Sequence, residues 1–435
     1  MNAFRTYQKL AGELNYALFY ALLIALPLPR FILQPIAVAW IISWVLECRF
    51  VPEGGWPALR DHIRTHWPLT LPGVLLVVYT LWEALSLLWA PDTVAGLKLI
   101  ERHWPFVILV LIPLFGFNEH YQSHKMLATL FAASVASVPL YLFTYYWVWN
   151  ADAVIWFNHD LLRPFEFPSF HGFTSLMKLR GFYCIILMLS ICSSPLLYRH
   201  YRQTYPRWKV MVTLGIGVAV MLTGMLMTGS RTALLTLFIT ALFLLFVGYR
   251  KRLRWWTQLL IIVGGLSIGV SALVFNTRFS LFTSADIEHL DLALATEQNE
   301  PRFFIWKAVF DHADEYGWFG LGAGQHIPFM MNLYQEAGNE LFLRMAYGPH
   351  SQYLSTWMCL GPLAVLLLLA VFVLIPRVYK GRAHYSAHAF AFLFAFSLIS
   401  DDLLERMDSI LILLVWMLLL YLIETTSSPI EQHPD

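Results

Sequence analysis

One histidine and three arginines have the residue types and positions that group-transfer chemistry needs. His350 lies in Gly348-Pro349-His350-Ser351, directly before an apolar segment. An imidazole with an ordinary pKa of about 6.5 can act there as a general base. Arg180 and Arg231 lie at the ends of apolar segments, and Arg302 follows Pro301 at the start of a predicted helix. A guanidinium donates two parallel hydrogen bonds and stays charged, so the three arginines are candidates for phosphate binding. The alternative for Arg180 and Arg231 is a membrane-interface anchor, and for Arg302 an ion pair with Glu300 or a nearby carboxylate.

Further polar residues near these positions are candidates for supporting roles. Lys178 lies two residues before the first of the arginines, and Gln352 and Tyr353 follow His350. Glu83 lies inside an apolar segment, where a carboxylate is either functional or paired with an arginine of another helix.

A carboxylate cluster, Asp401-Asp402-x-x-Glu405, has two interpretations. Clustered carboxylates can bind a divalent metal, but we favour pairing with Arg406 at a helix end. Two histidine pairs with helical spacing lack a third ligand in sequence, namely His62 and His66, and His384 and His388. Gly320-Leu321-Gly322-Ala323-Gly324 follows no strand, so we interpret it as a turn and not as a dinucleotide site. We therefore predict no metal and no cofactor.

The composition indicates which kind of fold must position these residues. Hydrophobic residues make up 58% of the chain and charged residues 13%, against ~25% in ordinary globular proteins. The mean hydropathy is +0.59, and 29 Lys and Arg balance 28 Asp and Glu. These values predict an all-α polytopic membrane protein and argue against a basic nucleic-acid-binding protein.

Apolar runs of spanning length indicate about twelve transmembrane helices in one integral membrane domain, 1–435. The expected spans are 14–28, 31–47, 69–90, 103–117, 126–149, 181–198, 210–228, 232–249, 255–275, 352–375, 389–405 and 409–423.

Lysines and arginines in the short loops predict the orientation, because cytoplasmic loops are enriched in them. Four loops on one side carry such clusters, including one with Arg49, Arg60 and Arg64, so both termini are expected in the cytoplasm. The opposite side then carries an aromatic loop, 150–180, and a large loop, 276–351. Within the large loop, Pro301 to Ala313 predicts a helix and Gly317 to Gly324 a break. The phosphate-binding candidates and His350 all fall on this side.

Four motifs together resemble the bacterial O-antigen ligase family, which is related to the O-antigen polymerases. Trp82-Glu83-Ala84-Leu85-Ser86-Leu87-Leu88-Trp89-Ala90 is similar to an early span of the family, and Thr228-Gly229-Ser230-Arg231-Thr232-Ala233 to its mid-chain hairpin. Arg302-x-x-x-Trp306, followed by Phe319-Gly320-x-Gly322-x-Gly324, resembles its large periplasmic loop. His350-Ser351-Gln352-Tyr353-Leu354 resembles its histidine signature. The resemblance covers roughly 80–360.

The resemblance implies a membrane glycosyltransferase of the GT-C-like type in the inner membrane of a Gram-negative bacterium, with its active site facing the periplasm. The donor would be O-antigen linked to undecaprenyl pyrophosphate, and the acceptor a sugar hydroxyl of lipid A-core. His350 would be the base of an inverting, metal-independent transfer. Arg231 and Arg302, with Arg180, would bind the pyrophosphate, and the aromatic loop would face the isoprenoid. The expected partners are these lipids, and no nucleic-acid partner is expected.

Two alternatives remain open at the level of the sequence. An O-antigen polymerase would use the same donor with a growing glycan as acceptor, but R-x10-G patterns associated with that group are absent at the three arginines. A transporter or flippase of lipid-linked sugars would place ionisable groups near the bilayer midplane. Apart from Glu83, the unusual charges lie at the exterior boundary instead.

Overall fold

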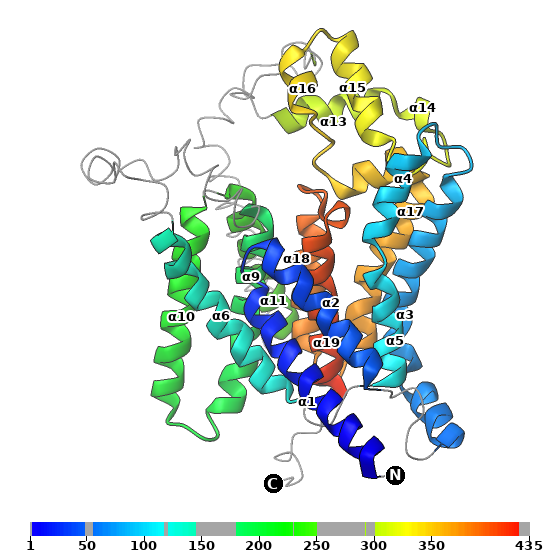
Figure 1. Ribbon diagram of the computed structural model, residues 1–435. Coiled ribbons are helices and arrows are strands. Elements are labelled where there is room, and N and C mark those ends of the chain that lie inside the picture. Colours follow the sequence, from blue (N-terminus) through cyan, green and yellow to red (C-terminus); the bar gives the residue numbers. More distant parts are fainter. Residues whose placement is uncertain are drawn as a thin grey trace, which may run out of the picture.

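The computed structural model describes residues 2–47, 55–116, 121–144, 180–228, 230–249, 292 and 301–425. Helices and turns make up this part of the chain (Figure 1). The helices are α1 (Asn2–Ala25), α2 (Arg30–Leu46), α3 (Gly55–Ser86), α4 (Thr93–Arg102), α5 (Pro105–Phe115), α6 (Ser123–Thr144), α9 (Arg180–Tyr201), α10 (Arg207–Met227), α11 (Arg231–Tyr249), α13 (Pro301–Asp311), α14 (Ala313–Tyr316), α15 (His326–Glu336), α16 (Glu340–Met345), α17 (Gln352–Val378), α18 (His384–Ser397), the 3-10 turn η5 (Leu403–Glu405) and α19 (Met407–Thr425).

Six of the described helices are long and apolar enough to cross a membrane, so the chain is a polytopic membrane protein. These segments are Leu59–Ser86, Ser123–Phe143, Gly181–Tyr201, Arg207–Met227, Gln352–Val378 and Met407–Thr425. Helices α1, α2, α5, α11 and α18 occupy five further segments that we predicted as spans. The expected span 255–275 and the aromatic loop 150–180 lie outside the described residues, and the number of crossings stays a prediction.

One loop prediction is wrong. Arg60 and Arg64, which we placed in a loop, lie in the first turns of α3. This part of α3 is polar, so an apolar-run criterion assigns it no helix, and Pro68 and Pro72 lie within the same helix. Helix α4 also had no prediction, because it has only ten residues and includes charged ones.

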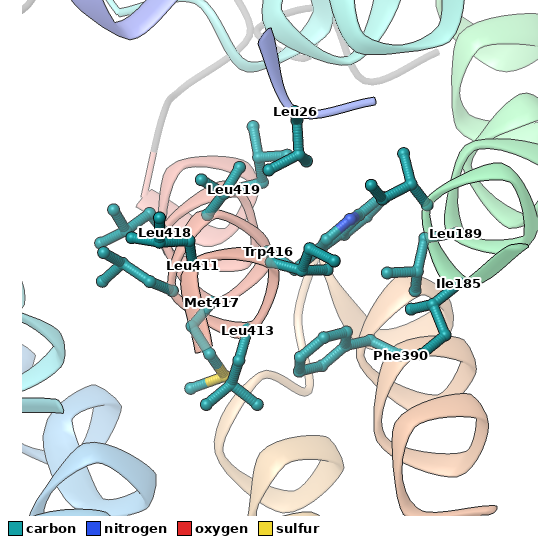
Figure 2. Packing of buried hydrophobic residues seen from close by; sticks show 14 of the residues in the cluster. Leu26, Ile185, Leu189, Phe390, Leu411, Leu413, Trp416, Met417, Leu418 and Leu419 are labelled. Carbon is teal, nitrogen blue, oxygen red and sulfur yellow. The ribbon is translucent and has the colours of Figure 1, made fainter. Parts of the chain in front are cut away.

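The core of the bundle is built around α19. Its side chains from Ser409 to Leu422 are all buried, because neighbouring helices cover it on every side. Figure 2 shows Trp416 of α19 among Leu26 from the α1–α2 turn, Ile185 and Leu189 from α9, and Phe390 from α18. An all-apolar helix buried on all faces is what this sequence segment predicts. The loop that precedes α19 is therefore attached to the most enclosed element of the fold.

The expected glycine turn is confirmed, and it packs against a kink in α17. Gly320 and Gly361 both have positive φ values, 73° and 78°. A Cβ atom at Gly320 would lie 2.3 Å from the carbonyl carbon of Cys359, so only glycine allows this approach. Leu321 N and Gly322 N then donate hydrogen bonds to two carbonyls freed at the kink, those of Met358 and Cys359.

The early tryptophan motif holds the same turn from the other side. Trp89 Nε1 donates to Gly320 O (3.1 Å), and Ala323 N donates to Ser86 Oγ (2.9 Å). Trp82 Nε1 donates to Leu360 O at the kink (3.0 Å). Two motifs that are far apart in sequence are thus one structural unit, whose role is to fix α3, α17 and the start of α15.

Helices α13 to α16 lie at one end of the bundle, at the top of Figure 1, and we call this the upper end. They enclose a small apolar core that includes Ile305, Val309, Tyr334 and Phe342. Met358 of α17 belongs to this core, so the four helices are anchored on a spanning helix.

Candidate functional site

His350 lies in the turn between α16 and α17 in a strained conformation. Its φ of 51° is in the left-handed region, which costs a non-glycine residue about 1–3 kcal/mol. The turn is held from α13, because Trp306 Nε1 donates a hydrogen bond to Pro349 O (2.9 Å). The ring of Tyr347 lies 5.5 Å from the His350 ring, centroid to centroid. Strain that the surroundings maintain in this way is typical of functional residues.

The surroundings of His350 favour its neutral form. Burial lowers its pKa to about 4, the positive charges of Arg302 and Arg406 act in the same direction, and Glu405 acts in the opposite one. At neutral pH the imidazole therefore keeps a lone pair that can accept a proton. The protonation state fits the predicted general base.

Arg302 links two of the sequence motifs. It is the second residue of α13, and its Nη1 donates to Thr232 Oγ1 of α11 (3.3 Å). Its charge also acts on His350. The structure therefore brings the predicted phosphate-binding arginine, the hairpin motif and the histidine signature to one place.

Arg231 is the first residue of α11, next to the threonine that Arg302 contacts; its side chain lies outside what the structure describes. The helix start is capped by Ser230, whose Oγ accepts a hydrogen bond from Ala233 N (3.4 Å). At the end of α10, Thr228 Oγ1 contacts Cys184 Sγ of α9 (3.2 Å). The polar residues of this motif thus fix where α11 begins.

Arg180 is the first residue of α9, and its side chain is likewise not described, while Lys178 lies outside the described residues. The start of α9 reaches the same site, because a Cβ atom at Gly181 would lie 2.9 Å from Asp401 Oδ2. All three predicted arginines thus occupy the first or second position of a helix. Helix N-termini carry partial positive charge and bind anions.

The carboxylates of the 401–405 segment have separate environments. Asp402 Oδ1 accepts a hydrogen bond from Ser355 Oγ (2.7 Å), while burial and the charge of Glu405 raise its pKa to about 7. Burial also raises the pKa of Asp401, although Arg302 and Arg406 act to lower it.

Glu405 forms an ion pair with a histidine of α15. Its Oε1 lies 2.9 Å from His326 Nε2, and the other ring nitrogen lies 3.3 Å from Cys359 Sγ. Burial opposes ionisation of Glu405, but the His326 charge, with Arg102 and Arg406, lowers its pKa. Burial likewise opposes the charge on His326, yet mainly the Glu405 charge raises the His326 pKa well above its ordinary value.

The expected pairing of the cluster with Arg406 is wrong. Among the described residues, no carboxylate lies within ion-pair distance of Arg406, whose guanidinium lies 5.5 Å over the Phe182 ring. The reason is tertiary: the nearest carboxylate in sequence, Glu405, pairs instead with His326. No group of three His, Cys, Asp or Glu suited to a metal ion occurs in the described part of the chain.

Glu83 pairs with a histidine and not with an arginine. Its Oε2 lies 2.5 Å from His103 Nδ1, and both side chains are buried. The Nε2 atom of His103 lies 2.8 Å from Leu404 O. Because both ring nitrogens face acceptors, the ring is best satisfied as an imidazolium. Burial opposes this charge, but Glu83 raises the pKa of His103 above its ordinary value.

Gln352 and Tyr353 have structural contacts. Gln352 is buried, and its Oε1 accepts a hydrogen bond from Leu404 N (2.7 Å). Tyr353 OH donates to Ala395 O of α18 (2.9 Å). Both residues attach the start of α17 to the segment around α18, so their support for His350 is indirect.

Sequence reasoning missed three residues of this site, Arg102, His103 and His326. Arg102 donates a hydrogen bond to Glu405 O, and the two histidines pair with carboxylates distant in the chain. Their one sequence signal was position. Arg102 and His103 lie at the end of a short amphipathic segment, and His326 follows the glycine turn. That signal carries no information about their partners.

The comparisons with known proteins agree with the motifs. Residues 216–369 match the family model described as O-antigen ligase, a segment that contains Arg231, Arg302, the glycine turn and His350. A search of curated proteins gave no match. Residues 216–369 of this chain are therefore similar to the O-antigen ligase family, and three of the four motifs lie within this segment.

Proposed function

We propose that the protein is an O-antigen ligase: an inverting, metal-independent glycosyltransferase that moves O-antigen from undecaprenyl pyrophosphate to a sugar hydroxyl of lipid A-core. The observation that carries this proposal is the neutral, strained His350 beside Arg302, inside the segment that matches the ligase family. A base and a phosphate-binding cation side by side are the two groups that the reaction requires.

In the proposed reaction His350 accepts the proton of the acceptor hydroxyl. The acceptor oxygen forms a bond to the anomeric carbon of the donor sugar from the face opposite the pyrophosphate. The bond between that carbon and the phosphate oxygen breaks, and undecaprenyl pyrophosphate leaves with the electron pair. Attack from the opposite face inverts the anomeric centre.

The leaving group gains negative charge as the bond breaks, so cations preorganised beside it lower the barrier. In this proposal Arg302 supplies one such charge, and Arg231, next in sequence to the Thr232 that Arg302 contacts, and Arg180, at the start of α9, supply the others. Arginine binds a pyrophosphate by two parallel hydrogen bonds, and no metal ion is needed in this scheme.

We further propose a GT-C-like architecture whose upper end faces the periplasm of a Gram-negative bacterium, with both termini in the cytoplasm. The distribution of lysine and arginine among the loops supports this orientation. The donor and acceptor are both lipids, so a site at the membrane boundary suits them. The aromatic loop 150–180 would line the path of the isoprenoid.

Purified protein in lipid nanodiscs, supplied with undecaprenyl-pyrophosphate-linked glycan, tests this function. With lipid A-core as acceptor we expect glycan joined to lipid A-core. Glycan elongated on the lipid carrier would identify a polymerase instead. Movement of unchanged donor across a sealed bilayer would identify a transporter, a function less consistent with Glu83 being paired to His103.

His350→Ala should lower the rate of transfer by about 10²–10⁴-fold, because it removes the general base. The matched control is His384→Ala, an exposed histidine at the start of α18, away from the site. We expect near wild-type transfer in the control. Wild-type transfer in a folded His350→Ala protein would overturn the assignment of the base.

A further inference from the structure

Arg406 is a cation at the centre of the upper end without a described role. It lies between η5 and α19, its side chain is exposed, and its guanidinium lies over Phe182 in the first turn of α9. Phe182 is two residues from Arg180, so Arg406 stands at the predicted phosphate-binding helix start. The charge of Arg406 also acts on His350 and on Asp401.

The carboxylates closest to Arg406 in sequence have other partners or surroundings. Glu405 pairs with His326, and Asp402 accepts a hydrogen bond from Ser355. Asp401 is directed toward the backbone at Gly181. Among the described residues, the guanidinium of Arg406 therefore keeps its hydrogen-bond donors available for a ligand anion.

Hydrogen bonds to backbone atoms fix the turn that carries Arg406. Gln352 accepts from Leu404 N (2.7 Å), and His103 binds Leu404 O (2.8 Å). Arg102 donates to Glu405 O, and Ser409 donates to Leu403 O and to Arg406 O. The partners of this turn come from four parts of the chain: α4 and the residue after it, α15, α17 and α19.

The backbone that carries Arg406 is therefore fixed, and its guanidinium lies over the Phe182 ring, so binding an anion costs this side chain less conformational entropy than it would cost an arginine on a mobile loop. Helices α9 and α11 begin at this end of the bundle, and α13 supplies Arg302. The segment before α19 adds a second described arginine, Arg406.

We propose that Arg406 is a further donor-binding residue that contacts the pyrophosphate of the lipid-linked glycan together with Arg302. This inference rests on the proposed function. His103 and His326 are positioning residues that hold the turn, and through it Arg406, against α3, α15 and α17.

Binding of undecaprenyl pyrophosphate without glycan tests the proposal apart from catalysis. The probe is radiolabelled lipid, and the proteins are wild type, Arg406→Gln and Arg406→Lys in nanodiscs of neutral lipid. Loss of a charged hydrogen bond should raise Kd by about tenfold or more in Arg406→Gln. Arg406→Lys should fall between the two, because it keeps the charge but loses the planar fork.

Arg344→Gln is the matched control, since Arg344 is an exposed arginine of α16 at the same end of the molecule. Its Kd should equal that of wild type. Thermal unfolding followed by tryptophan fluorescence verifies that each variant is folded; because Arg406 is exposed, its Tm should stay unchanged.

Three results would overturn the proposal. Equal Kd in wild type and folded Arg406→Gln removes Arg406 from the donor site. A weaker affinity for lipid A-core phosphates, with donor affinity unchanged, assigns Arg406 to the acceptor. If wild type itself fails to bind undecaprenyl pyrophosphate, the proposed function fails as well, which distinguishes that result from the first two.

Discussion

At the scale of residues, three histidines at the upper end differ in charge because of their neighbours. His103 and His326 each face a carboxylate, which raises the pKa of the imidazole against the effect of burial. His350 is partly buried, and its burial together with the charges of Arg302 and Arg406 lowers its pKa to about 4. The same side chain is thus favoured in its charged form in two places and in its neutral form in the third, where we propose that it acts as the base.

The pH dependence of the reaction should report the charge next to His350. Activity is lost on acidification when His350 becomes protonated, and Arg302 and Arg406 lower the pH at which this happens, while Glu405 raises it. In Arg302→Gln the pKa of His350 should rise, so the acidic limb of kcat/KM should move to higher pH.

The measurement is kcat/KM for the donor across the acidic range, with Arg344→Gln as the control for a lost surface charge. An acidic limb at the same pH in Arg302→Gln and wild type would show that His350 is not the titrating base. A lower rate alone would not be informative, because Arg302 also binds the donor in this scheme.

At the scale of elements, the short turn η5 is positioned by ion pairs and not by its own sequence. His326 and Glu405 lie 2.9 Å apart, with 5% and 18% of their side chains exposed. Removing one partner of such a buried pair leaves an uncompensated charge, whereas replacing both by apolar residues is often nearly neutral.

We therefore expect His326→Leu to lower the free energy of unfolding by about 3 kcal/mol, and the double variant His326→Leu/Glu405→Leu to lower it by less. Reversible thermal or denaturant unfolding in detergent measures both. Equal losses in the two proteins would mean that the pair contributes packing only.

The pH dependence of this pair has two limits. The pKa of His326 is raised in the folded protein. The stability that its charge contributes is therefore fully present below the pKa of His326 in the unfolded chain, and it is lost as the pH rises through the pKa in the folded protein. The pKa of Glu405 is lowered in the folded protein. The stability that its charge contributes is therefore lost as the pH falls through the pKa of Glu405 in the folded protein. At both low and high pH, the free energy of unfolding of wild type should therefore fall relative to that of the double variant.

At the scale of the whole molecule, the upper end collects the candidate chemistry of the described residues, and the buried helix α19 holds it in place. The segment from Asp401 to Arg406 directly precedes this helix in the chain, so its position is coupled to the core. A rigid platform of this kind suits a reaction that depends on orientation.

The orientation of the molecule is tested by accessibility of cysteines placed at its two ends. Trp318→Cys is exposed at the upper end, and Arg377→Cys is exposed near the end of α17 that lies away from it. A membrane-impermeant maleimide added to cells with a permeabilised outer membrane should label only Trp318→Cys. Labelling of Arg377→Cys alone would reverse the proposed topology. The parent protein controls for its own cysteines.

The sequence by itself determined the membrane class, most helix positions, the glycine turn and the similarity of residues 216–369 to the O-antigen ligase family. These features depend on local patterns: apolar runs, positive-φ glycines and short motifs. Two of those motifs proved to be one unit, in which Trp89 and Ser86 hold the turn at Gly320 and Ala323.

Only the tertiary structure decided the charge and partners of the polar residues. Glu83 pairs with His103 and Glu405 with His326, whereas the sequence suggested an arginine partner for the carboxylate cluster and, as one of two alternatives, for Glu83. Such pairs join segments far apart in the chain, and their formation depends on how helices pack, which no local pattern encodes. Packing likewise left Arg406 without a carboxylate within ion-pair distance among the described residues, and near enough to His350 for its charge to lower the pKa of that histidine.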